Sequence, residues 1–188
     1  ISTLLTSVSI ATDKNEDGPL VGKAAKFWSL KTIDGKFEKL NNYTAPSGKE
    51  FRGDGERKVI VMSFFASWCQ PCIKEIGELH ELKKELADTP VQFFLVNLTE
   101  FFRHRQKDTK KYSQAPDAME FLSRKGLTDI TVLQDPTGRT ARAYGVSDVL
   151  PRLFVIDKYG IVKKDETGLC STCLNDELYP LIEQLIQE

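Results

Sequence analysis

The stretch from Val59 to Cys72 reads VIVMSFFASWCQPC and decides the fold of this chain. Up to Ala66 its residues are almost all apolar, and many are β-branched or aromatic, which predicts a strand buried on both faces. After a short turn, Cys69 and Cys72 open a segment with helical spacing. The stretch therefore predicts a buried strand that delivers two thiols to a helix N-terminus, where free N–H groups and the helix dipole stabilise a thiolate.

The segment after the two cysteines carries one apolar stripe. Ile76, Leu79 and Leu86 recur at helical spacing and predict a helix that ends near Asp88. Residues 91–98 form a second apolar run. Because a helix joins the two strands, we expect a βαβ unit with parallel pairing.

The rest of the chain supplies hairpins and further helices. Asp34-Gly35 lies between two short strand-like runs and predicts a hairpin. Two later strands, 152–157 and 161–164, are joined by so short a connection that they must be antiparallel. The remaining expected elements are helices at 116–125, 137–144 and the C-terminus, and an extended piece at 131–133.

Length and charge limit the possible functions. The chain has 188 residues, with 26 basic and 27 acidic side chains and a formal net charge of −1. This balance gives no field that favours nucleic acid or an anionic membrane, and no run approaches the roughly 20 apolar residues that span a bilayer. We expect one domain over 20–188, acting as a monomer without a membrane span or nucleic-acid partner. Residues 1–19 form an arm, either the end left after removal of an export signal or a short strand or disordered segment.

One charged cluster stands out between 101 and 113. A docking surface for an acidic partner is one interpretation, because loops after parallel strands lie on the functional rim of such sheets. A solvated face is the other, because an aspartate interrupts the run. The cluster consists of Arg103, His104, Arg105, Lys107, Lys110 and Lys111.

The order of elements, with Trp68-Cys69-Gln70-Pro71-Cys72 at the first strand-to-helix turn, resembles the thioredoxin fold. More narrowly, it resembles the exported TlpA/ResA-like thiol–disulfide oxidoreductases, from Leu20 to the C-terminus. The resemblance implies an α/β, thioredoxin-like fold with an N-terminal β-hairpin extension, a helical insertion and a mixed central sheet flanked by helices. It also implies a periplasmic or otherwise extracytoplasmic protein without a cofactor. Such a protein reduces disulfides of protein substrates and receives electrons from an upstream redox donor.

The two cysteines of the central motif take different roles. Cys69 lies just before the helix and is expected to be partly exposed, so its thiolate attacks a substrate sulfur and forms a mixed disulfide. Cys72 lies one turn in, and it attacks Cys69 to release the product and leave an intramolecular disulfide. Trp68 either shields this disulfide and contacts substrate or simply packs in the core.

Proton transfer needs a separate group. Thioredoxins carry a buried acid on the central strand, and the matching position here is Ser63, which cannot serve as that acid. The exported reductases instead have a glutamate just past the second cysteine, where this chain has Glu75. If half-buried, its carboxyl group would have a raised pKa and could exchange protons with Cys72. An ordinary glutamate in the first helical turn is the alternative.

Leu150-Pro151 matches the position of the family's cis-proline, which the fold places against the dithiol. The exposed backbone beside such a bond can pair with an extended substrate peptide. Leu150 and Pro151 are therefore candidate substrate-binding residues, and a trans proline that only opens a strand is the alternative.

A second Cys-x-x-Cys pair, Cys170 and Cys173, precedes the last helix. The fold would bring it to the same rim as the first pair. Three roles remain open: a disulfide that stiffens the loop, a redox relay to the first pair, or metal binding.

The two cysteine pairs and the fold are also compatible with two other functions. A binding or metal-carrier module would use both cysteine pairs as ligands, although zinc sites usually place such pairs about 15–20 residues apart. A peroxiredoxin would need a proline seven residues before Cys69, where this chain has Met62. The leading prediction is thus a thiol–disulfide oxidoreductase with a Cys69/Cys72 dithiol and no metal site.

Overall fold

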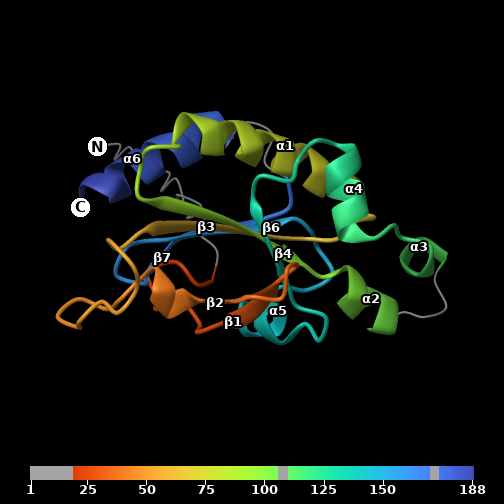
Figure 1. The fold of residues 1–188 in the computed structure, drawn as a ribbon, viewed down its shortest axis with the longest axis horizontal. Helices are drawn as coiled ribbons and strands as arrows, with labels where there is room; N and C mark the ends of the chain where they lie inside the picture. Colours follow the sequence, from red (N-terminus) through yellow and green to blue (C-terminus); the bar gives the residue numbers. More distant parts are fainter. Residues whose placement is uncertain (1–18, 106–109, 170–173) are drawn as a thin grey trace, which may run out of the picture.

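A single mixed sheet organises the structure, a computed structural model that describes residues 19–105, 110–169 and 174–188. The seven strands follow the order β2-β1-β5-β4-β3-β6-β7. Helices α1 and α6 cover one face of the sheet, and α5 lies on the opposite face (Figure 1). The strands are β1 (Ser29–Thr32), β2 (Phe37–Lys39), β3 (Val59–Phe65), β4 (Val91–Asn97), β5 (Thr131–Gln134), β6 (Arg152–Ile156) and β7 (Val162–Thr167).

Strand β3 lies inside this sheet, between β4 and β6, and is buried as its composition predicts. Every residue of β3 is buried, and the strand pairs in parallel with β4 and antiparallel with β6. Helix α1 (Gln70–Glu85) connects β3 to β4 and buries Ile76 and Leu79 against the sheet. The βαβ unit and its parallel pairing are therefore confirmed.

The two predicted hairpins are also present. β1 and β2 pair antiparallel around Gly35, whose φ of 84° suits the turn residue. β1 pairs on its other side with β5, so the N-terminal extension belongs to the sheet. β6 and β7 form the second hairpin, and the isolated bridge of Ala24 to Ile161 adds the chain before β1 to it.

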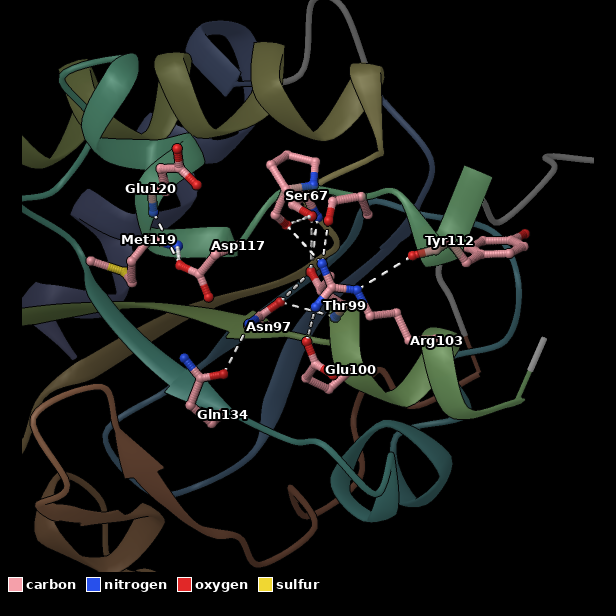
Figure 2. Close-up of polar contacts among 12 residues, drawn as sticks. Ser67, Asn97, Thr99, Glu100, Arg103, Tyr112, Asp117, Met119, Glu120 and Gln134 are labelled. Atoms are coloured by element: carbon pink, nitrogen blue, oxygen red, sulfur yellow. Dashed lines mark hydrogen bonds and ion pairs between the residues drawn. The ribbon is translucent and has the colours of Figure 1, made fainter. Parts of the chain in front are cut away.

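The insertion after β4 is helical, and one helix starts later than predicted. The helix predicted to start at Pro116 is α4 (Ala118–Arg124), and Asp117 is its N-cap residue. The Asp117 carboxylate accepts hydrogen bonds from the backbone N–H groups of Met119 and Glu120 at 2.8 and 3.1 Å, so it caps the first turn (Figure 2). The other helices are α2 (Thr99–Arg105), α3 (Lys110–Ser113), α5 (Arg139–Ala143) and α6 (Tyr179–Gln187), with a 3-10 turn η1 (Leu40–Asn42) and a π-helical turn η2 (Leu174–Leu178).

The predicted arm over 1–19 lies outside the described residues except for its last residue, Pro19. The next residue, Leu20, already contacts the sheet. The backbone N–H of Leu20 donates to the Asp165 carboxylate on β7 at 3.0 Å. Asp165 in turn forms a buried ion pair with Arg152 on β6.

Candidate active site

A disulfide joins Cys69 and Cys72 at the N-terminus of α1. Cys69 is the N-cap residue of the helix, and its Sγ accepts a hydrogen bond from the backbone N–H of Cys72 at 3.2 Å. Pro71 lies in the first turn, where its missing N–H costs no helical hydrogen bond. A thiolate on Cys69 would therefore receive both a backbone donor and the positive end of the helix dipole.

The burial of the two cysteines differs from the prediction in one respect. Cys72 is 1% exposed, as expected, but Cys69 is only 3% exposed instead of partly exposed. The Cys69 Sγ is bonded to the buried Cys72 and lies against the Cys72 backbone N–H, and these contacts reduce its exposure. The neighbouring side chains remain accessible: Trp68 is half-buried, and Gln70 and Pro71 are exposed.

Glu75 lies one turn after Cys72 on α1, which places the two side chains on the same side of the helix. Its carboxyl group is buried, and its Oε1 accepts a hydrogen bond from the Ser63 Oγ of β3 at 2.5 Å. Burial raises the pKa of Glu75 to about 7, the Ser63 hydrogen bond opposes this rise, and the negative charges of Glu78 and Glu166 add to it. The helix and the central strand thus meet in a buried carboxyl–hydroxyl pair.

The Leu150–Pro151 peptide bond is cis, as the resemblance implies. Because Arg152 on β6 pairs with Phe64 on β3, the preceding Pro151 lies level with the end of β3, from which the chain continues to the cysteines. Leu150 and Pro151 are both buried, whereas the preceding Val149 is 53% exposed. The Pro151 carbonyl accepts a hydrogen bond from the backbone N–H of Gly168 at 2.8 Å.

Trp68 packs against the helical insertion. Its ring lies 5.3 Å from that of Phe102 on α2 and 4.8 Å from that of Tyr112 on α3, measured between centroids, and both contacts are edge to face. The rings of Phe102 and Tyr112 are themselves nearly parallel. The insertion therefore forms one wall of the site beside Cys69.

A polar network that the sequence analysis missed joins Ser67, Thr99 and Asn97 beside the turn before Cys69 (Figure 2). The backbone N–H of Ser67 donates to Thr99 Oγ1 at 3.0 Å, and Thr99 Oγ1 donates to Asn97 Oδ1 at 2.7 Å. Asn97 Nδ2 donates to Gln134 Oε1 at 2.9 Å. The sequence signal was available, because Asn97 and Thr99 are polar residues at the carboxyl end of a strand, the end at which α/β sheets build sites.

Arg103 was predicted to belong to a basic cluster at the surface, and this assignment is wrong. Its guanidinium donates to the backbone carbonyls of Tyr112, Ala115 and Pro116, which satisfies it within the insertion. His104 and Arg105 are exposed, and Arg105 pairs with Asp148 at 3.5 Å. The docking interpretation therefore concerns only the rest of the cluster.

The second cysteine pair, Cys170 and Cys173, lies outside the described residues. Within the part of the chain that the structure describes, no three His, Cys, Asp or Glu side chains gather as a metal site. Over the same residues, no helix combines the length and apolar character needed to cross a membrane.

Known proteins are similar to this chain in both sequence and architecture. Residues 21–165 match the model of the AhpC/TSA family. The thiol-disulfide oxidoreductase ResA of Geobacillus thermodenitrificans is 30% identical over 148 residues, which cover 79% of this chain and 70% of the relative. A crystal structure assigned to a thiol:disulfide interchange protein DsbE from Chlorobium tepidum superposes with a TM-score of 0.66 at 26% identity, covering 88% of this chain and 97% of the other.

A second solved structure shares this arrangement. The exposed lipoprotein thioredoxin Etrx1 of Streptococcus pneumoniae superposes with a TM-score of 0.59 at 25% identity, covering 85% of this chain and all of the other. The relatives and the Cys69–Cys72 disulfide together support a redox-active dithiol, and they give the metal-carrier alternative no support. The chain therefore belongs to the AhpC/TSA family, among its thioredoxin-like thiol–disulfide oxidoreductases.

Proposed function

We propose that this protein reduces disulfides of protein substrates through Cys69 and Cys72. The observation that carries the proposal is the Cys69–Cys72 disulfide at the N-terminus of α1, one helical turn from a buried carboxyl group. In the reduced protein, the Cys69 thiolate attacks one sulfur of the substrate disulfide. A mixed disulfide forms, and the other substrate sulfur leaves as a thiolate.

The second half of the reaction belongs to Cys72. Its thiolate attacks the Cys69 sulfur of the mixed disulfide, which releases the second substrate thiolate and leaves the Cys69–Cys72 disulfide. Two electrons have then passed from the protein to the substrate. An upstream dithiol protein must return them before the next turnover, so the protein has two kinds of partner.

Glu75 is proposed as the group that takes the proton from Cys72. A general base works best when its pKa lies near the operating pH, and the pKa of Glu75 is raised to about 7 by burial. Glu75 and Cys72 share one side of α1, and Ser63 fixes the carboxyl group through its hydrogen bond. Because Ser63 cannot act as the buried acid, the proposed proton relay uses its hydrogen-bond partner, Glu75.

Trp68, Leu150 and Pro151 are proposed to contact the substrate. Trp68 precedes Cys69 in the turn, and the register of β3 with β6 brings Pro151 level with the end of β3. Val149, which is 53% exposed, continues this surface toward solvent. The arrangement suits an extended peptide that passes between the tryptophan and the segment before β6.

An extracytoplasmic location, such as the periplasm, is the compartment proposed for this reaction. One solved relative is called an exposed lipoprotein thioredoxin, which supports a place outside the cytoplasm. Disulfides of substrate proteins form and persist in such oxidising compartments. One chain supplies both cysteines and the proposed base, so the proposed reaction needs no second copy, and a monomer is the state proposed.

Insulin reduction tests the proposal. With dithiothreitol as electron donor, the wild-type protein should accelerate insulin precipitation, and Cys69→Ser should not. Cys72→Ser should accumulate a mixed disulfide with a substrate protein, because Cys69 can attack but the complex is not resolved. If the wild type and Cys69→Ser both match dithiothreitol alone, the proposed activity is wrong.

A further inference from the structure

The Arg103 guanidinium binds three backbone carbonyls and one carboxylate of the insertion. Its Nε donates to the Tyr112 carbonyl at 3.3 Å, and one terminal nitrogen donates to the carbonyls of Ala115 and Pro116. The other terminal nitrogen pairs with the Glu100 carboxylate one turn earlier on α2. The planar guanidinium has five donors in a fixed fork, so it holds these groups in one relative position.

The Pro116 carbonyl connects Arg103 to the turn that carries the reactive cysteine. This carbonyl accepts a hydrogen bond from the Ser67 hydroxyl at 2.7 Å and a longer one from Arg103 at 3.4 Å. Ser67 is 2% exposed, and its backbone N–H donates a hydrogen bond to Thr99 of α2. Figure 2 shows the Arg103 guanidinium reaching from α2 toward Ser67 and Thr99, with Tyr112 on its other side.

A second connection runs through aromatic rings. Arg103 binds the carbonyl of Tyr112, and the Tyr112 ring lies against the half-buried Trp68. Phe102, the residue before Arg103, contacts the same tryptophan. Both neighbours of Cys69 on its N-terminal side, Ser67 and Trp68, are therefore held by residues that Arg103 positions.

We propose that Arg103 is a positioning residue that fixes the Trp68 wall beside Cys69 for the entry of protein disulfides. This role rests on the proposed function, and it assigns the insertion a part in choosing the substrate. Arg103 is not a catalytic residue, because it touches neither cysteine. A protein substrate must fit against the wall, whereas a small disulfide needs only access to the Cys69 sulfur.

Arg103→Gln removes the charged fork, and Arg124→Gln is the matched control. Arg124 lies on helix α4 of the same insertion, carries the same charge and is 67% exposed, but it pairs with Glu120 at the surface. Arg103→Lys is a second variant that keeps the charge beside Glu100 and loses the fork. The variants are compared in insulin reduction, in reaction of the reduced protein with the small disulfide DTNB, and in acrylamide quenching of tryptophan fluorescence.

The expected result separates the substrates. For Arg103→Gln, kcat/KM with insulin should fall roughly tenfold, as expected from the loss of hydrogen bonds made by a charged group, while the DTNB rate changes less than about twofold. Arg103→Lys should lie between the wild type and Arg103→Gln, and Arg124→Gln should match the wild type. Quenching should increase for Arg103→Gln, and the change reports on Trp68 because Trp28 is only 2% exposed.

Two outcomes would overturn the role of Arg103. One is an equal loss of insulin and DTNB reactivity in both Arg103 variants, which indicates a general structural effect. The other is unchanged insulin kinetics and unchanged quenching. Failure of the proposed function can be distinguished from failure of the proposed role of Arg103. If the wild type does not reduce insulin, the quenching experiment still shows whether the exposure of Trp68 depends on Arg103.

Discussion

Replacing Glu75 by glutamine should make the oxidised protein more stable at alkaline pH. The carboxyl group of Glu75 is buried, and its pKa is raised from 4.5 to about 7, chiefly by desolvation. In the unfolded chain the group ionises near pH 4.5, whereas in the folded protein it keeps its proton until about pH 7. The folded state therefore binds more protons between these values, so stability falls as pH rises through this window.

The magnitude follows from the shift. A difference of one pKa unit corresponds to about 1.4 kcal/mol, so the shift of Glu75 costs the folded protein about 3 kcal/mol once the group is ionised in both states. At pH 5 the same relation leaves a cost of about 1 kcal/mol. Glutamine keeps the size and the acceptor for Ser63 but cannot ionise. The free energy of unfolding of Glu75→Gln, relative to that of the wild type, should thus be about 2 kcal/mol higher at pH 8 than at pH 5.

Urea unfolding of the oxidised protein at pH 5 and pH 8, followed by circular dichroism, measures this difference. Glu85→Gln is the control, because Glu85 lies on the same helix and is exposed. Its stability relative to the wild type should not depend on pH in this range. A gap between wild type and Glu75→Gln that is equal at the two pH values would refute the assignment of a near-neutral pKa to Glu75.

Other substitutions test the fold and the independence of the first dithiol. Gly138→Ala should lower stability by roughly 2 kcal/mol or more in thermal unfolding, because φ is 63° and the new Cβ would lie 2.5 Å from an aromatic ring of α2. Asp165→Ala should cost about 3–5 kcal/mol in urea unfolding, because it leaves Arg152 buried without its partner; a loss below 1 kcal/mol would contradict this account. Cys170→Ser combined with Cys173→Ser should retain insulin reduction, because the proposed attacking thiol, resolving thiol and base lie elsewhere in the chain.

The central part of the fold could be predicted because local pattern and tertiary environment agree there. The apolar run of β3 requires burial on both faces, and the spacing of Ile76 and Leu79 requires one buried helix face, so both elements follow from the sequence. The start of α4 could not be placed to the residue. Proline and aspartate both favour helix starts, and only the observed hydrogen bonds show that Asp117 forms the cap.

The candidate site was only partly predictable, because several contacts join residues far apart in the sequence. In the sequence, Ser63 stands where an acid is missing and Glu75 stands as its replacement, and only the structure joins the two side chains in one hydrogen bond. Arg103 resembles its charged neighbours in sequence. Its carbonyl partners, nine to thirteen residues later, depend on how the chain folds back. Composition and spacing carry no information about such a return.

The pairing of β1 with β5 has a consequence for how the chain assembles. β1 contacts β5 through Lys31 with Gln134 and Thr32 with Leu133, so the N-terminal hairpin cannot complete its docking until the ribosome has made about a hundred further residues. Once docked, it covers a strand that would otherwise offer a free backbone edge to another molecule. The short β2, flanked by Lys36 and containing Glu38 and Lys39, then forms the border of the sheet. The hairpin thus protects the sheet against self-association. A chain that lacks the residues before Gly35, and with them β1, would expose the edge of β5 to pairing with another molecule.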